Sequence, residues 1–118
     1  MVIELRQYQT ADDHSPYATW FAGLHAVAAA KIVTALTRLE AGNTSNVKAV
    51  GEGVSELKID FGPGYRVYFG WDGLELVILL GGGTKKRQNA DIKKAQVYWT
   101  DYKTRKREAQ KKAAQQCH

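Results

Sequence analysis

The central stretch of the chain, residues 57–86, constrains the fold most, because it alternates apolar segments with turn signals. It reads LKIDFGPGYRVYFGWDGLELVILLGGGTKK. The turns are marked by Gly62-Pro63-Gly64 and by Trp71-Asp72-Gly73, and Asp-Gly between alternating segments is a strong hairpin signal. The stretch therefore predicts an antiparallel meander, with strands at about 56–61, 65–71 and 75–81.

The pattern inside these strands indicates how each one is buried. Tyr65, Val67 and Phe69 fall on one face of the second strand, and Arg66 falls on the other. Residues 76–80 are almost wholly apolar, which is typical of a strand covered on both faces. We therefore expect Arg66 on the wetter face of a sheet whose last strand lies in the interior.

The first forty residues predict a strand and a helical hairpin. Residues 2–8 alternate in polarity, which predicts a strand. Ser15 followed by Pro16 is a helix-start signal, because Ser caps free N–H groups and Pro suits the first helical position. A short helix is expected at about 16–23. Apolar residues at helical spacing then predict a second helix at about 25–41, ended by a Gly-Asn pair.

The remaining segments predict a loop and a last helix. Residues 43–55 are polar and contain glycine, so they are interpreted as a loop. Asn89 is placed to cap the last helix, whose buried face is marked by Ile92, Ala95, Trp99 and Tyr102. The order β-α-α-β-β-β-α predicts an α+β domain. In it, an N-terminal helical hairpin and a C-terminal helix pack on an antiparallel sheet of about four strands.

The length suits one folded domain, which we expect over residues 1–103. Residues 104–118 form a basic C-terminal tail. No large apolar side chain follows Tyr102, so a helix there has no stripe with which to dock. We therefore expect the tail to be exposed or disordered unless a partner covers it.

Composition excludes several classes of protein. No apolar run reaches the about 20 residues that span a bilayer. The N-terminus lacks the basic-then-apolar pattern of a signal peptide, so the expected location is the cytoplasm, without membrane contact. The only cysteine, Cys117, has no partner for an internal disulfide and is interpreted as an incidental thiol.

Catalytic residue types at a recognisable spacing are sparse. His14, His25 and His118 have no second His or Cys at metal-ligand spacing, so we expect neither a metal nor another cofactor. The chain lacks a Gly-x-Ser-x-Gly nucleophile motif. Residues 81–86 lack the second Gly and the Gly-Lys-Ser/Thr ending of a phosphate loop, so they do not predict a nucleotide site of that type.

Charge is distributed unevenly along the chain. Residues 1–83 contain six Lys or Arg and nine Asp or Glu, a balance of −3, whereas residues 84–118 contain eleven and three, a balance of +8. Such a split favours a polyanionic partner, either an acidic protein or a nucleic acid. The alternative interpretation is a solvated basic helix end without a ligand.

The cations of the central stretch form the candidate site. Arg66 lies on a strand and Lys85, Lys86 and Arg87 follow a strand end, with Lys48 and Lys58 near in sequence. Cations brought together in this way bind phosphates and stabilise the charge that develops in phosphoryl transfer, and Arg presents a bidentate fork. The alternative, weighted equally, is a structural Arg66 paired with Glu56 or Asp60. A solvent-accessible guanidinium is therefore the condition for the catalytic interpretation.

The sequence also resembles a known group of proteins. GEGVSELKIDFGPGYRVYF, the apolar strand after it and LLGGGTKKRQNADIKKA resemble the RelE/ParE/HigB toxin superfamily over about residues 1–103. Within it, the likeness is to the branch of phage-derived Gp49-like or addiction module killer proteins. The element order expected above agrees with the RelE-like fold.

The resemblance implies the toxin of a type II toxin–antitoxin system, a ribosome-dependent mRNA endoribonuclease that inhibits translation. In such enzymes the RNA 2′-hydroxyl attacks the adjacent phosphate, giving 2′,3′-cyclic phosphate ends. Carried over by position, the resemblance assigns phosphate stabilisation to Arg66, a phosphate-binding or acid role to Lys85 or Lys86, and a base role to Lys58. Further residues are assigned to RNA binding, namely Lys48, Tyr65, Tyr68, Arg87 and Tyr98.

The same resemblance implies partners and leaves other functions open. It implies a cognate helix-turn-helix antitoxin that masks the basic face, in a complex expected to be a heterotetramer, and it implies binding to the ribosome and mRNA. A ParE-like inhibitor of DNA gyrase without nuclease chemistry is the first alternative, because one fold serves both activities. A phage-derived protein that acts on the host is the second.

Overall fold

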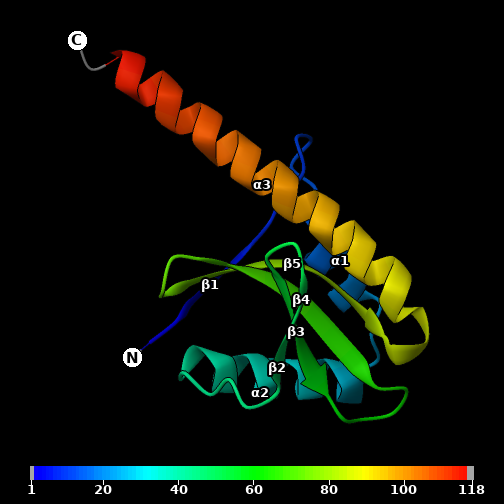
Figure 1. The fold of residues 1–118 in the computed structure, drawn as a ribbon. Helices are drawn as coiled ribbons and strands as arrows, with labels where there is room; N and C mark the ends of the chain where they lie inside the picture. Colours follow the sequence, from blue (N-terminus) through cyan, green and yellow to red (C-terminus); the bar gives the residue numbers. More distant parts are fainter. Residues whose placement is uncertain (1, 117–118) are drawn as a thin grey trace.

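One five-stranded sheet with helices on both faces organises the chain, for which the computed structural model describes residues 2–116 (Figure 1). The elements in chain order are β1 (Glu4–Gln7), α1 (Pro16–Ala22), α2 (Ala26–Glu40), β2 (Val47–Gly51), β3 (Val54–Ile59), β4 (Tyr65–Asp72), β5 (Leu76–Thr84), the 3₁₀ turn η1 (Lys85–Arg87) and α3 (Gln88–Gln116). The predicted α+β class is confirmed, and every predicted strand and helix is present.

The strand order is β1-β5-β4-β3-β2, and the sheet is mixed. The meander from β2 to β5 is antiparallel, as predicted for its three later strands. β1 pairs with β5 in parallel, so the expectation of an antiparallel sheet is wrong at this edge. Strand direction at an edge depends on how the chain returns through α1 and α2, which local alternation does not encode.

The expectation of a loop over residues 43–55 is wrong in part, because β2 forms there and is the fifth strand. β2 is an edge strand, so one side of its backbone remains unpaired and only two of its residues, Val47 and Val50, are partly buried. An edge strand of this kind needs few apolar residues, and its sequence therefore looks like a loop. Gly51 and Gly53, both at positive φ, form the turn into β3.

Two apolar layers lie on opposite faces of the sheet. The layer beneath it contains Ile32 and Leu39 of α2 together with Val67 and Phe69 of β4. The layer above it lies under α3, which crosses the sheet on the side opposite α2 (Figure 1). The first six residues of β4 are consequently all buried. The prediction that residues 76–80 are covered on both faces is confirmed, but β4 is covered as well.

The helix boundaries follow their capping signals. The Ser15 hydroxyl accepts a hydrogen bond from the Ala18 N–H at 3.1 Å, and Pro16 is the first helical residue, as predicted. His25 caps α2 in the same manner, with its Nδ1 accepting from the Ala28 N–H at 3.3 Å. The last helix begins at Gln88, directly after η1, so Asn89 lies inside the helix and the expectation that it caps the helix is wrong.

α3 docks through its first half and projects beyond the sheet with its second half (Figure 1). Ala95 and Trp99 are buried and Ile92 and Tyr102 partly buried, which confirms the predicted face. Residues 104–116 continue the helix and are exposed, as expected of the tail, while Cys117 and His118 lie outside the described residues. None of the helices within residues 2–116 is long and apolar enough to cross a membrane.

Asp72, at the end of β4, holds the middle of α3. Its carboxylate accepts hydrogen bonds from the Tyr102 hydroxyl and the Lys106 ammonium, each at 2.5 Å. The hydrogen bond from Lys106 has the largest effect and the one from Tyr102 the next. Together they hold the pKa of Asp72 below its ordinary value, although burial acts in the opposite direction. The carboxylate therefore stabilises the fold above its unfolded pKa, and this contribution is lost as the pH falls through the folded pKa.

We expect Asp72→Asn to lower the free energy of unfolding at pH 7 by about 1–2 kcal/mol, because hydrogen bonds to the charged group are lost. The difference from the parent protein should shrink as the pH falls below about 4, where the carboxyl protonates in the unfolded chain. Urea denaturation at a series of pH values measures it. Asp60→Asn is the matched control, since that exposed carboxylate lies 3.6 Å from Lys58 and should change stability by less than about 0.5 kcal/mol. A pH-independent deficit for Asp72→Asn would contradict this account.

Candidate functional site

Arg66 lies in the interior, between the sheet and the start of α3. Its side chain is 6% exposed, and its Nε lies 3.3 Å from Oε2 of Glu56, which is 5% exposed. Arg66 Nη1 also donates to the backbone oxygen of Tyr65 at 3.2 Å. The Gln88 amide donates to the other Glu56 oxygen at 2.7 Å, so the pair is joined to the first residue of α3.

The expectation that Arg66 lies on the wetter face of the sheet is therefore wrong. The geometry is that of the structural alternative, in which Arg66 pairs with Glu56. The cause is tertiary, because the face that carries Arg66 is the one on which α3 packs. Burial leaves the guanidinium without the solvent access that contact with RNA requires, so the condition set for the catalytic interpretation of Arg66 is not met. A nuclease site would have to be built from the exposed lysines alone.

A cationic turn follows β5. Lys85, Lys86 and Arg87 form η1 and are all exposed, and with Gln88, Asn89 and Ala90 they line a cavity of about 450 Å³. The turn leads directly into the N-terminus of α3, where the helix dipole also favours an anion. The arrangement suits a phosphate group.

The strand register places the other predicted cations at this end of the sheet. Lys58 of β3 is opposite Arg66 of β4, which in turn is opposite Gly83, two residues before Lys85. Lys58 and Lys48 are both exposed, and Lys48 lies on the edge strand. The register thus places exposed cations on β2, on β3 and in the turn after β5, while Arg66 between them is buried.

The two tyrosines predicted to contact RNA on β4 are on opposite faces. Tyr65 is 6% exposed and lies in the lower layer, where its ring packs edge-on against Trp20 at 6.4 Å. Stacking of an RNA base on Tyr65 is incompatible with this position. Tyr68 faces α3, and there it lines a pocket that the sequence did not reveal.

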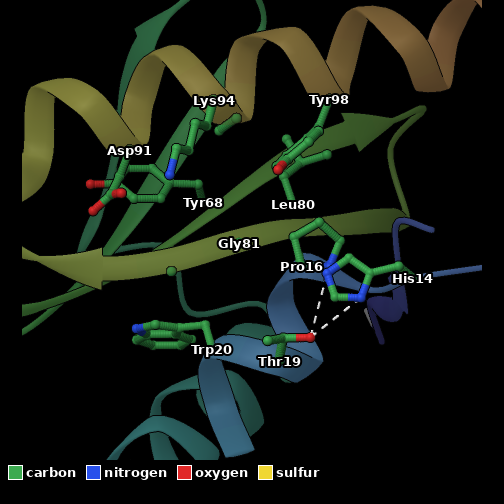
Figure 2. A pocket seen from close by; sticks show the side chains of 12 residues that line it. His14, Pro16, Thr19, Trp20, Tyr68, Leu80, Gly81, Asp91, Lys94 and Tyr98 are labelled. Atoms are coloured by element: carbon green, nitrogen blue, oxygen red, sulfur yellow. Dashed lines mark hydrogen bonds between the residues drawn. The ribbon is translucent and has the colours of Figure 1, made fainter. Parts of the chain in front are cut away.

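This pocket lies at the free edge of β5. Within residues 2–116, β1 pairs only with residues 76–79, so the second half of β5 has no strand on that side there, and α1 contacts it instead. The resulting cavity, between α1, β5 and α3, has a volume of about 260 Å³. Figure 2 shows its lining, which comprises His14, Pro16, Thr19, Trp20, Tyr68, Leu80, Gly81, Gly82, Asp91, Lys94, Ala95 and Tyr98.

Polar groups of opposite charge lie side by side in this pocket, which we call the β5-edge pocket. Figure 2 shows Asp91, Tyr68 and Lys94 in the same part of the pocket, and the charge of Asp91 acts on Tyr68 while that of Lys94 acts on Asp91. The Tyr68 hydroxyl is buried and has no hydrogen-bond partner among residues 2–116. Burial raises the pKa of Tyr68 above its ordinary range, and the nearby charges of Glu56 and Asp91 add to this effect. The group is therefore a neutral O–H donor.

Asp91 is a partly buried carboxyl. Burial raises its pKa, and the positive charges of Arg87 and Lys94 partly offset that effect. Its Oδ2 lies against the bare backbone of Gly83, where a Cβ would overlap it. The absence of a side chain at Gly83 is therefore what allows the carboxyl to sit here.

Aromatic rings and bare backbone complete the β5-edge pocket. The Trp20 ring lies against Gly82 and leaves no space for a Cβ there. The Tyr98 ring stacks on Tyr8, with centroids 5.2 Å apart. At Gly81, by contrast, a Cβ would have no atom within 4 Å, so the strand backbone there faces open space. At the mouth of the pocket, the Thr19 hydroxyl is within 3.5 Å of the His14 ring nitrogens.

Sequence reasoning missed most of this pocket. His14, Asp91 and Lys94 belong to no recognisable motif in the sequence, and none of them predicts a site there. A signal was nevertheless present: Asp91, Lys94 and Tyr98 recur at spacings of three and four, so they share one face of α3 with the buried Ala95. Only the position of α1 beside β5 shows that this face lines a cavity.

Comparison with known proteins identifies the family. Residues 19–112 match the family described as "Phage derived protein Gp49-like (DUF891)". The chain belongs to this Gp49-like family. A Haemophilus influenzae relative described as "Uncharacterized protein" is 41% identical over 98 residues, which cover 82% of this chain and 93% of the relative.

Membership of the Gp49-like family confirms the predicted branch, and the matched segment contains the cationic turn and most of the β5-edge pocket. The Gp49-like family belongs to the wider RelE/toxin-like superfamily. Among the pocket residues, the matched segment includes Trp20, Tyr68, Asp91 and Lys94. β1 and His14 precede it.

Proposed function

We propose that this Gp49-like protein is the toxin of a type II toxin–antitoxin pair and cleaves mRNA on the ribosome. The observation that supports the proposal most directly is the cationic turn, in which Lys85, Lys86 and Arg87 are exposed at a helix N-terminus. Such a turn suits the phosphates of a polynucleotide and gives no obvious advantage to a protein that binds only apolar surfaces.

The chemistry requires no external reactant. The ribose 2′-oxygen forms a bond to the adjacent phosphorus and loses its proton to a base. The bond from phosphorus to the 5′-oxygen breaks, and that oxygen takes up a proton, which leaves a 2′,3′-cyclic phosphate and a 5′-hydroxyl. In this proposal Lys85 and Lys86 bind the phosphate and stabilise its developing negative charge, and one of them donates the proton that the 5′-oxygen takes up. Lys58, in its uncharged form, accepts the proton of the 2′-hydroxyl.

Arg66 has a different role from the one its position in the sequence suggests. Because it is buried against Glu56, we assign it as a positioning residue. Through Glu56 and Gln88 it holds the start of α3, and with it the cationic turn, against β3 and β4. The charge that contacts RNA comes from the exposed lysines.

The same surface supports a proposal for the partner. An antitoxin that covers Lys85 to Arg87 would neutralise the phosphate-binding groups and so block the activity. A helix-turn-helix antitoxin with an acidic segment fits this requirement, and the complex would be the proposed heterotetramer. Charge complementarity would then govern the rate of association.

We expect the double variant Lys85→Ala/Lys86→Ala to lose growth inhibition and to leave mRNA intact. The measurement is induction in a bacterial host followed by mapping of new 5′ ends inside reading frames. The matched control is Lys111→Ala/Lys112→Ala, which removes the same charge from the exposed end of α3. In vitro, loss of two phosphate contacts should lower the salt slope of single-stranded RNA binding by about 1.4.

One observation favours a second function. With Arg66 neutralised by Glu56, the cluster contains one accessible cation fewer than a nuclease site built on Arg66 would have. A ParE-like inhibitor of DNA gyrase needs no such site. Intact mRNA together with a supercoiling defect on induction of the parent protein would overturn the nuclease proposal in favour of this alternative.

A further inference from the structure

The β5-edge pocket has no part in the chemistry proposed for the cationic turn, yet charged groups and aromatic rings line it. Tyr68 is 1% exposed, and its buried hydroxyl has no partner among residues 2–116. Because that hydroxyl is closed off from solvent, Tyr68 contributes its ring to the wall of the pocket, and the polar contacts for a ligand come from the α3 side chains.

The shape of the pocket favours a small flat molecule. Its volume of about 260 Å³ is at the small end for ligand sites. Its walls include the Trp20 and Tyr98 rings, and at Gly81 the strand backbone is bare and open. Planar walls and an absent side chain suit a ring that enters along the edge of β5 (Figure 2).

The polar groups define what the edges of that ring must carry. The Asp91 carboxylate accepts hydrogen bonds, whereas the Lys94 ammonium donates them, and both line the pocket (Figure 2). The ligand therefore needs neighbouring donors on one edge and acceptors on another. We propose that the β5-edge pocket binds a guanine base.

Guanine meets both requirements. Its N1–H and N2–H donors are adjacent and suit a carboxylate, and its O6 and N7 are the acceptors that lysine commonly contacts. Adenine and cytosine each present an acceptor beside their exocyclic amine, which would face the Asp91 carboxylate. Uracil offers a single N–H. Asp91 is thus the residue that selects against the other three bases, and Lys94 reinforces the choice.

The guanine belongs either to a free nucleotide or to single-stranded RNA. In the second case the pocket sets the base preference of the nuclease, and the inference then rests on the proposed function. Both cases share the same recognition by Asp91 and Lys94, so one set of variants tests both.

The first experiment compares GMP with IMP, which has the same phosphate and ring but lacks the 2-amino group. Titration calorimetry with the full chain should give about tenfold tighter binding of GMP. Asp91→Asn should abolish the difference between the two nucleotides. Lys94→Ala should weaken GMP binding about tenfold, whereas Lys93→Ala, its exposed neighbour outside the pocket, should not. Circular dichroism checks that each variant is folded.

The second experiment uses hexauridylate RNA with one central guanosine or inosine. A preference for guanosine that Asp91→Asn removes assigns the base to RNA, whereas a preference with GMP alone assigns it to a free nucleotide. Equal binding of guanine and hypoxanthine in both formats would overturn the inference. A guanine preference that survives both Asp91→Asn and Gly81→Val would also overturn the inference, because the Val side chain fills the open space at Gly81.

The outcome is separable from that of the proposed function. Lys85→Ala/Lys86→Ala leaves the β5-edge pocket unchanged and should retain the GMP preference. If growth inhibition proves unrelated to mRNA cleavage while that preference holds, the nuclease proposal fails and the pocket assignment stands. If cleavage is confirmed without any guanine preference, the nuclease proposal stands and the pocket assignment fails.

Discussion

Arg66→Ala is expected to lower the free energy of unfolding by about 3–5 kcal/mol, because it leaves Glu56 as a buried carboxylate without its counter-charge. Glu56 keeps one hydrogen bond from Gln88, which does not neutralise it. This loss is a large fraction of the stability of a small domain. Urea denaturation followed by circular dichroism measures it. A change below about 1 kcal/mol would contradict a buried pair.

Loss of toxicity in Arg66→Ala would by itself not distinguish catalysis from folding. The double variant Glu56→Leu/Arg66→Met removes both charges and replaces them with apolar side chains, a change that is often neutral for buried pairs. It should recover most of the stability that Arg66→Ala loses. If Arg66 holds the cationic turn through Glu56 and Gln88, growth inhibition stays low in this folded variant, because the hydrogen bond between Glu56 and Gln88 is lost with the pair. A folded double variant with full toxicity would show that the pair does not position the turn.

Local signals in the sequence predicted most of the fold. The meander over residues 57–86, the start of α1 at Ser15-Pro16 and the buried face of α3 all depend on neighbours close in the chain. Each of these signals has its physical cause within a few residues, so no tertiary information is needed. β2 and the parallel pairing of β1 were not predicted, because an edge strand is defined mainly by the strand beside it.

The candidate site was predictable only where it is local. Lys85, Lys86 and Arg87 adjoin in the sequence and were found together, exposed, as expected. The burial of Arg66 depends on α3, which begins more than twenty residues later, and alternation alone assigned that face to solvent. The β5-edge pocket depends on three elements and on the early end of β1, so no pattern within one element reveals it.

Gly70→Ala is expected to lower the free energy of unfolding by about 2–3 kcal/mol, because it overpacks the contact between β4 and α3. A Cβ at Gly70 would lie 2.5 Å from the Trp99 ring, which is 5% exposed, so the ring or the backbone of β4 must shift to accept it. Trp99 also packs on Gly53 and stacks on Tyr102, with ring centroids 5.2 Å apart. Chemical denaturation of the parent protein and the variant measures the loss.

Gly81→Ala is the matched control, because it makes the same change on the next strand where a Cβ meets nothing within 4 Å. It should be neutral or stabilise the fold by up to about 1 kcal/mol, since alanine restricts the unfolded chain. Both variants restrict the unfolded backbone in the same way. The difference between their free energies of unfolding therefore measures the steric clash of the new Cβ with Trp99. Equal effects would mean that α3 does not rest on Gly70 through Trp99. Because α3 supplies both the cover over Arg66 and one wall of the β5-edge pocket, that result would also remove the basis for assigning either one.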